Sequence, residues 1–288
     1  MSAQPSSRPV AAETPVALTI AGSDSGGGAG IQADLKAFAR CGVHGTSAIT
    51  AITAQSTIGV AAVHPLPSEM ILAQVRAVAE DMTIAAVKVG MLADVEVVGA
   101  VARALSLLPE QTPVVVDPVM VAESGARLLA EGAEQALARE ILPRATVVTP
   151  NLPEARVLAG SPAVGSSDDA DPAEAEALAR AVLSLGAGAV VLTGGHRTRA
   201  VDLFIDSPAG VAVEIEGPRY PDGAAHGSGC THSAALAAQL ALGRSPLEAA
   251  RAARALASAA IRDGLRGIGR GAGPVDVLGL RRMREQPF

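Results

Sequence analysis

Short apolar runs rich in β-branched residues alternate with longer segments of helical periodicity along most of the chain. The expected strands cover 16–20, 45–54, 59–63, 85–92, 113–117, 146–149 and 189–193, and a hairpin joins 200–205 to 211–215. The expected helices cover 31–40, 68–82, 94–107, 173–185, 232–242 and 246–262, with another beginning near Leu152. This alternation predicts a largely parallel sheet with helices on both faces.

Length and composition favour one folded domain. With 288 residues, of which 49% are hydrophobic and 18% charged, the chain can bury a substantial core. We expect a single domain over 16–288, after a disordered tail over 1–15 that lacks the apolar core of a secretory signal. The two cysteines, Cys41 and Cys230, indicate neither a disulfide framework nor a zinc site. A cytoplasmic protein without a membrane segment fits these features.

The charge pattern argues against nucleic acid as a partner. The formal net charge is −6, and no basic stripe runs along the chain. Aromatic residues make up 1% of the chain, so stacking of bases on aromatic side chains is not expected. Any anionic ligand must therefore be bound by local groups.

The segment HGSGCT at 226–231 leads directly into an alanine-rich helical pattern. Small residues at a helix start leave backbone N–H groups exposed at its positive end, which suits a phosphoryl group. Cys230 lies at this start, where a thiol tends towards a lowered pKa and can act as a base or a polar contact. The alternative is a glycine turn before a core helix, with Cys230 as a small buried side chain.

Further candidates lie in or near the loops after expected strands, where open α/β sheets bind ligands. The glycine-rich segment 21–30 follows the first strand but matches neither the dinucleotide nor the Walker pattern. Asp34, in the next helix, either faces the same crevice or is a solvated acid near the helix start. Gln55 has donors and an acceptor that suit the edge of a heterocycle, or is a loop residue. Met91 either lines a pocket or fills the core.

Oxygen-bearing side chains follow two more strands. Asp117 ends a buried strand and precedes Pro118, a placement that suits magnesium. Asn151 follows the next strand as a candidate N-cap, with Glu154 three residues later. A capping box explains this pair nearly as well as a role at metal-bound water.

Seven segments occur in the order found in one enzyme family. They are 17–39, TAITAQ (50–55), VKVGML (87–92), VVVDPVMVAESG (114–125), VTPNLPEA (148–155), GGH (194–196) and HGSGCT (226–231). On these segments the chain, from about residue 16 to 275, resembles the hydroxymethylpyrimidine/phosphomethylpyrimidine kinases of thiamine biosynthesis, members of the ribokinase-like superfamily.

The resemblance implies a ribokinase-like three-layer α/β/α sandwich with a mostly parallel central sheet. It implies a kinase that uses ATP and Mg²⁺ to phosphorylate 4-amino-5-hydroxymethyl-2-methylpyrimidine and then its monophosphate. A homodimer is also expected. Two alternatives stay open: a pyridoxal or pyridoxine kinase of the same superfamily, and a non-catalytic pyrimidine-binding regulator.

The resemblance also implies a role for particular residues. Those implied to bind the pyrimidine are Gly22, Asp34, Gln55, Met91 and Val119. Gln55 would read the aminopyrimidine edge, while Met91 and Val119 would supply apolar walls. Cys230 stands where sugar kinases of the superfamily carry an aspartate base, and Gly227 and Gly229 would form the cradle for the transferred group.

The remaining implied roles concern the nucleotide and the metal. The residues implied to contact the nucleotide are Asn151, Thr193, Gly195 and Ser228, and those implied to arrange magnesium are Asp117 and Glu154. Two positions depart from the family pattern. Thr193 stands where many relatives have Lys, and Glu123 stands where they have Lys or Thr. A cation near the phosphates is thus lost, although the Thr193 hydroxyl can still donate a hydrogen bond.

Overall fold

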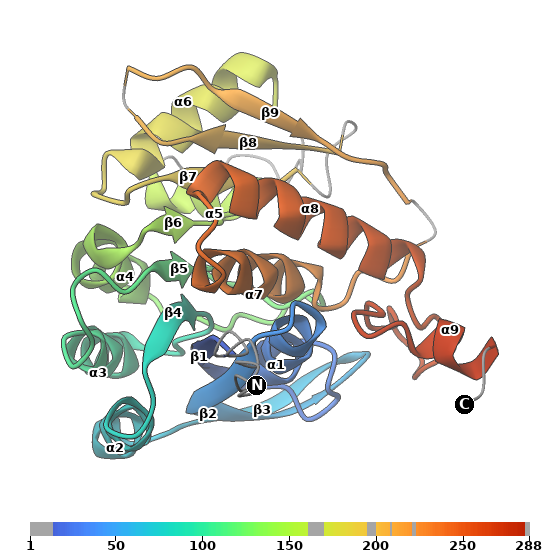
Figure 1. Cartoon of the computed structure of the whole chain (residues 1–288), viewed down its shortest axis with the longest axis horizontal. Coiled ribbons are helices and arrows are strands. Elements are labelled where there is room, and N and C mark those ends of the chain that lie inside the picture. The colour runs from blue at the N-terminus through green and yellow to red at the C-terminus, as the bar shows by residue number, and fades with distance from the viewer. Residues whose placement is uncertain (1–13, 161–169, 195–199, 208, 221–222, 286–288) are drawn as a thin grey trace, which may run out of the picture.

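The strands of the protein form one sheet in which the central strands run parallel (Figure 1). The computed structural model describes residues 14–160, 170–194, 200–207, 209–220 and 223–285. Within these residues the sheet has nine strands in the order β3-β2-β1-β4-β5-β6-β7-β8-β9. From β2 to β7 every neighbouring pair is parallel, whereas β3, β8 and β9 are joined antiparallel. The expected mostly parallel sheet is confirmed.

The strands lie close to the apolar runs that predict them. Their bounds are β1 Val16–Ser23, β2 His44–Ser56, β3 Gly59–Pro65, β4 Ile84–Val89, β5 Val114–Val116, β6 Val147–Val148, β7 Val190–Leu192, β8 Val201–Ile205 and β9 Val213–Glu216. β8 and β9 form the expected antiparallel pair, with Val201 opposite Glu216. The central strands are buried on both sides because helices cover both faces of the sheet.

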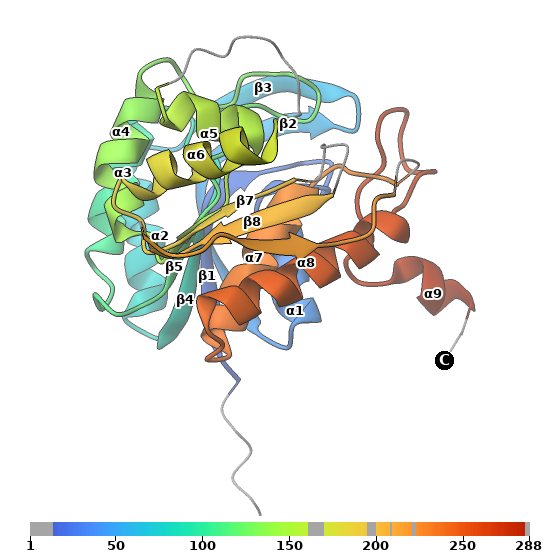
Figure 2. The same ribbon diagram turned by 90° about the horizontal axis from the view of Figure 1, so that it is seen from above.

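Helices form a layer on each face of the sheet (Figure 2). Their bounds are α1 Gly30–Arg40, α2 Ser68–Ala79, α3 Val95–Leu105, α4 Ala133–Glu140, α5 Leu152–Leu158, α6 Pro172–Leu183, α7 Ser228–Ala241, α8 Pro246–Arg262 and α9 Leu280–Glu285. α1, α7 and α8 pack on one face, and α2 to α6 pack on the other. The expected three-layer α/β/α arrangement is confirmed.

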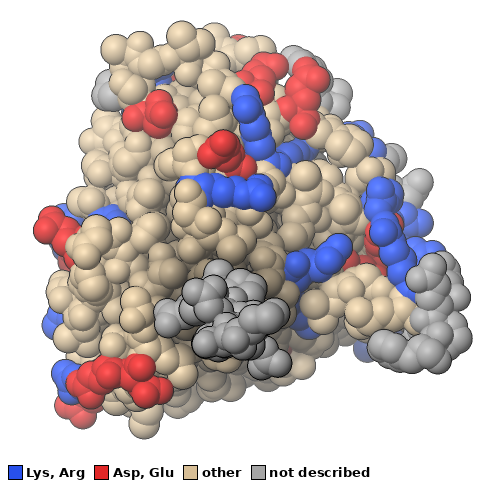
Figure 3. Space-filling model, viewed as in Figure 1, with Lys and Arg blue, Asp and Glu red and all other residues tan. Residues whose placement is uncertain are grey.

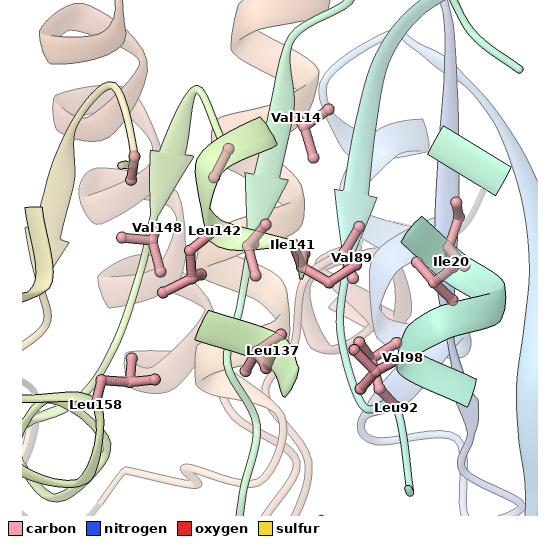
Figure 4. Packing of buried hydrophobic residues seen from close by; sticks show 14 of the residues in the cluster. Ile20, Val89, Leu92, Val98, Val114, Leu137, Ile141, Leu142, Val148 and Leu158 are labelled. Atoms are coloured by element: carbon pink, nitrogen blue, oxygen red, sulfur yellow. The ribbon is translucent and has the colours of Figure 1, made fainter. Parts of the chain in front are cut away.

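Alternation of side chains along each strand supplies a core to each layer. Val114 and Val116 of β5 pack with α2 to α6, whereas Val115 between them packs with α1, α7 and α8. Figure 4 shows the first of these cores, in which Val89 lies near Ile141 and Val148 lies near Leu142. Both cores consist of aliphatic side chains with few aromatic ones, in line with the composition.

Three helical segments differ from the expectation. α7 begins at Ser228 and not at 232, because Gly227 takes a left-handed N-cap conformation with φ of 80° and the small residues after it are already helical. α4 and α9 were not predicted. α4 also follows a left-handed glycine, Gly132 with φ of 82°, and its packed face is short: Ala133, Ala136 and Leu137. Such a short apolar face produces little periodicity in the sequence.

Acidic and basic side chains are interspersed on the face shown in Figure 3. Among the described residues that face presents no continuous basic surface of the kind that attracts nucleic acid. A search of the described part of the chain finds no helix both long enough and apolar enough to cross a membrane. The expected tail over 1–15 lies almost wholly outside the described residues.

Candidate active site

A cavity of about 200 Å³ lies at the carboxyl ends of the parallel strands. Its walls come from the segments after β1, β4, β5, β6 and β7 and from the first turn of α7, together with residues of β2, β8 and α8. Of the predicted site residues, those that line it are Gly22, Gln55, Met91, Asp117, Val119, Asn151, Glu154, Thr193, Gly227, Ser228, Gly229 and Cys230. Parallel strands bring these positions together because all their carboxyl ends meet at one edge. Gly195 lies outside the described residues.

The N-terminus of α7 opens into this cavity. Gly227 is its N-cap, no side chain caps it, and its first turn contains no acidic residue. An α-helix leaves its first N–H groups without partners inside the helix, so those of Gly229 and Cys230 are available at the positive end. This geometry suits a phosphate or another anion.

The two glycines of this helix start are constrained differently. A Cβ on Gly227 would lie 1.8 Å from the carbonyl oxygen of Gly28, so the two backbones touch at this point. A Cβ on Gly229 would meet no protein atom within 4 Å. Gly227 is therefore needed for the fold, whereas the missing side chain of Gly229 only leaves room for a ligand.

Asp24 and His226, which sequence reasoning missed, join the same two segments. His226 Nε2 lies 3.0 Å from Asp24 Oδ2, and the Asp24 carboxylate also accepts hydrogen bonds from the N–H groups of Gly26, Gly28 and Ala29. Burial alone would raise the pKa of Asp24, but these hydrogen bonds, led by that from His226, hold it below its usual value. An Asp two residues before a glycine run was a signal for such a turn.

Asp34 does not line the cavity, contrary to the expectation that it faces the crevice. Its fully buried side chain accepts hydrogen bonds from Lys88 Nζ, at 3.0 Å to each oxygen, and from Thr19 Oγ1 at 2.6 Å. Burial alone would lower the pKa of Lys88, but the Asp34 carboxylate outweighs this and raises it, so Lys88 stays charged. Lys88 is itself part of the cavity wall, and sequence reasoning missed it because its partner lies 54 residues away.

Gln55, Met91, Val119 and Gly22 all line the cavity. Met91 belongs to a small buried cluster, and Val119 packs against that cluster. A Cβ on Gly22 would lie 2.8 Å from Met91 Sδ, so the absence of a side chain at Gly22 is what admits Met91. Gln55 Oε1 accepts a hydrogen bond from Thr53 Oγ1 at 3.3 Å. The part of the wall lined by these residues therefore combines apolar surface with one carboxamide.

Asp117 and Glu154 place two carboxyl groups in the cavity wall. Asp117 Oδ2 accepts a hydrogen bond from Ser233 Oγ at 2.9 Å. Glu154 and Asn151 form the capping box, with Asn151 N–H donating to Glu154 Oε2 and Glu154 N–H donating to Asn151 Oδ1, each at 2.9 Å. Burial, and next the Asp117 carboxylate, raise the pKa of Glu154 to about 8.

This carboxylate pair fits a magnesium ion. Burial and the Asp117 carboxylate disfavour the charged form of Glu154, and a bound cation would act in the opposite direction and favour that form. Mg²⁺ commonly binds proteins through one or two carboxylates and completes its shell with phosphates and water. The described residues contain no group of three or more His, Cys, Asp or Glu that could hold a metal by themselves. The capping box satisfies Glu154 structurally, and its role towards a metal stays a prediction.

The Cys230 thiol differs from the expectation of a lowered pKa. Burial raises the pKa of Cys230 to about 12, although the nearby Lys88 ammonium acts in the opposite direction. The position of Cys230 at a helix start does not by itself determine its pKa, because the carboxylates of Asp117 and Asp34 also disfavour a thiolate there. Cys230 is therefore a neutral thiol at pH 7.

Thr193, Asn151 and Ser228 lie along the remaining wall of the cavity. Thr193 forms an isolated parallel bridge with Asn151, and its hydroxyl donates to the carbonyl oxygen of Pro150 at 3.4 Å. Glu123, the second departure from the family pattern, also lines the cavity. Neither departure supplies a positive charge.

The fold and site define a ribokinase-like kinase, in which a helix N-terminus faces carboxylates at the edge of a parallel sheet. The model of the phosphomethylpyrimidine kinase family matches residues 24–276, and the chain belongs to this family. A hydroxymethylpyrimidine/phosphomethylpyrimidine kinase of Rhizobium meliloti is 48% identical over 265 residues, covering 91% of this chain and 96% of the relative.

Solved structures share the fold at lower sequence identity. The pyridoxal kinase of Bacillus subtilis in complex with ADP has a TM-score of 0.81 and 35% identity, covering 94% of this chain and 100% of the other. The phosphomethylpyrimidine kinase of Clostridium difficile has a TM-score of 0.71 and 37% identity, covering 84% and 97%. Two kinase specificities therefore occur among the structural neighbours.

The helix start yields a matched pair of variants. Gly227→Ala is expected to lower the free energy of unfolding by at least about 2 kcal/mol, because its Cβ overlaps Gly28 and its φ is left-handed. Gly229→Ala is expected to keep or slightly raise stability, since alanine favours a helix, yet to weaken binding of a non-hydrolysable ATP analogue about tenfold by filling the anion site. Denaturant unfolding and calorimetric titration measure both. Normal binding of the ATP analogue by Gly229→Ala would exclude this helix start as the site of the terminal phosphate.

The protonation of Cys230 can be measured by alkylation. In a Cys41→Ser background, the rate with iodoacetamide is expected to rise with pH through an apparent pKa well above the value of about 8.5 for a free cysteine. The same protein unfolded in denaturant serves as control and is expected to titrate near about 8.5. An apparent pKa at or below that value in the folded protein would mean that the helix dipole and Lys88 outweigh burial.

Proposed function

We propose that the chain transfers the terminal phosphoryl group of ATP to the hydroxymethyl oxygen of 4-amino-5-hydroxymethyl-2-methylpyrimidine, and afterwards to the phosphate of the product. The observation that carries the proposal is the arrangement of one cavity. An apolar end with Gln55 lies in the same space as the N-terminus of α7 and the Asp117–Glu154 pair. A flat heterocycle and a polyphosphate can thus be bound side by side.

At the pyrimidine end, Met91 and Val119 hold the ring faces and Gln55 binds the ring edge. Burial of a flat ring between apolar side chains fixes its plane, and the carboxamide fixes its rotation because it can both donate and accept. The hydroxymethyl group is then directed towards Cys230 and the start of α7. These residues therefore determine which oxygen is phosphorylated.

At the phosphate end, the chain provides positioning and electrostatic stabilisation. The N–H groups of Gly229 and Cys230 donate to the transferred group, whose charge spreads over its oxygens during transfer. Asp117 and Glu154 would hold Mg²⁺, which neutralises charge on the phosphates. Asn151, Thr193 and Ser228 line the path of the nucleotide.

Cys230 acts in this proposal as a neutral hydrogen-bonding contact and not as a strong base. Its high pKa leaves the proton on sulfur at pH 7. Phosphoryl transfer with a loose transition state needs little prior deprotonation of the acceptor. The bond between the terminal phosphorus and its bridging oxygen breaks and releases ADP, the acceptor oxygen bonds to phosphorus, and the hydroxyl proton then passes to water.

Further parts of the proposal concern assembly and location. A homodimer and a cytoplasmic location stay predictions. Apolar side chains on the β2–β3 edge, among them Ile52 and Val63, are 43% and 37% exposed, which supplies surface that a second copy would cover. Gel filtration with light scattering measures the assembly.

A pyridoxal kinase is the second candidate, because a pyridoxal kinase is among the structures with high TM-scores. Product analysis separates the two. With ATP and Mg²⁺, kcat/KM for the pyrimidine alcohol is expected to exceed that for pyridoxal by at least about tenfold, a difference of about 1.4 kcal/mol in transition-state binding. Mass spectrometry is expected to detect the monophosphate first and the diphosphate later.

Gln55→Ala tests the basis of that preference. It is expected to raise KM for the pyrimidine and leave KM for ATP unchanged, since a buried two-sided hydrogen-bond partner is worth about 1 kcal/mol or more. Gln74→Ala, outside the cavity, is the control.

The comparison of the two substrates in the wild-type protein decides the specificity. A greater kcat/KM for pyridoxal than for the pyrimidine alcohol would replace the pyrimidine with pyridoxal as the substrate.

A further inference from the structure

Three charged or polar side chains meet in the wall of the main cavity. Asp202 from β8, His232 from α7 and Arg254 from α8 are 0%, 5% and 7% exposed. Arg254 Nη1 lies 3.4 Å from Asp202 Oδ1, and His232 Nε2 lies 3.5 Å from Asp202 Oδ2. Burial lowers the pKa of His232, so its ring is neutral at pH 7. Arg254 is thus the positive charge of the cluster.

One hydrogen-bond donor of the Arg254 guanidinium has no partner among the described residues. Its Nη2 donates to the carbonyl oxygen of Ala200 at 2.5 Å, but its buried Nε has no hydrogen-bond partner within the described part of the chain. Leaving a buried donor of a charged group unpaired is destabilising. Such a group in a cavity wall indicates a ligand that accepts the hydrogen bond.

The guanidinium is held where two cavities adjoin. Arg254, Ser228 and Ile261 line both the main cavity and a second cavity of about 180 Å³. A Cβ on Gly217 would lie 2.6 Å from Arg254 Nε, so the backbone of Gly217 makes the room in which the guanidinium lies. A ligand extending from one cavity into the other would pass this side chain.

The other permanent cation of the main cavity is already paired. Among its described lining residues, Lys88 and Arg254 carry fixed positive charge. Lys88 is fully buried and bonded to both oxygens of Asp34. The carboxylates that line the cavity are Asp24, Asp117, Glu123, Glu154 and Asp202. An anionic chain bound there therefore depends on Arg254 for a cationic partner with a free donor.

We propose that Arg254 contacts the phosphate chain of the bound nucleotide where the two cavities adjoin, supplying the positive charge that Thr193 does not. This inference rests on the proposed use of ATP. Thr193 lines the cavity from the position just after β7, and Arg254 lines it from α8. A guanidinium with an unpaired N–H binds a phosphate oxygen through a charge-assisted hydrogen bond, whereas a threonine provides only a neutral one.

Calorimetric titration of the whole chain with ADP and with adenosine tests the contact. Arg254→Met is expected to raise Kd for ADP at least about tenfold and to change Kd for adenosine less than about twofold, because only ADP carries phosphates. Arg254→Lys is expected to fall between Met and the wild type. Adding Thr193→Lys to Arg254→Met is expected to recover part of the ADP affinity.

Arg251→Met, an exposed position one turn earlier on α8, is the matched control and is expected to bind ADP normally. Equal loss of ADP and adenosine binding in Arg254→Met, or no loss of either, would overturn the proposed contact while leaving the kinase function in place. Absence of ADP and ATP binding by the wild-type protein would instead overturn the proposed function, and this contact with it. Affinity for the pyrimidine, expected to be unchanged, reports whether Arg254→Met retains the fold of the site.

Discussion

The site depends on the contact between the backbones of Gly28 and Gly227, two segments about 200 residues apart in the chain. Gly227 has no room for a Cβ and has a left-handed φ of 80°, so the start of α7 lies directly against the loop after β1. The hydrogen bond between Asp24 and His226 closes the same junction beside it. Without this approach, the helix N-terminus and the strand ends would not face one cavity. Gly227 is thus required first for packing against Gly28, and the anion site at the start of α7 results from that packing.

Most of the charged side chains around the cavity interact with other side chains of the protein. Lys88 in the cavity wall is bonded to Asp34, and burial together with the Asp117 carboxylate disfavours the charged form of Glu154. Cys230 lies between these groups and stays protonated because burial outweighs the nearby ammonium. The site therefore presents backbone N–H groups and a neutral thiol to the reacting oxygens. Its capacity to bind anions comes from directed donors more than from net positive charge.

The sequence predicts the sheet and most of the cavity wall, because alternating strands and helices place all parallel strand ends at one edge. Gln55 and Asp117 were identified by this rule, and the structure places both in the cavity. The pairing of Asp34 with Lys88 could not be identified in the same way, since it joins α1 to β4 over 54 residues. The pKa of Cys230 was predicted in the wrong direction, because burial and neighbouring charges are set by tertiary structure. The kinase family, by contrast, could be recognised from local sequence motifs, and the model of this family matches residues 24–276.

The central claim is that the phosphoryl group is transferred at the N-terminus of α7 to a pyrimidine held by Gln55 and Met91. A crystal structure of the protein with a non-hydrolysable ATP analogue, Mg²⁺ and the pyrimidine alcohol tests this most directly. We expect the terminal phosphate within hydrogen-bond distance of the Gly229 and Cys230 N–H groups, with the hydroxymethyl oxygen facing it. A terminal phosphate bound away from this helix start, or a pyrimidine outside the Gln55 end of the cavity, would contradict the account.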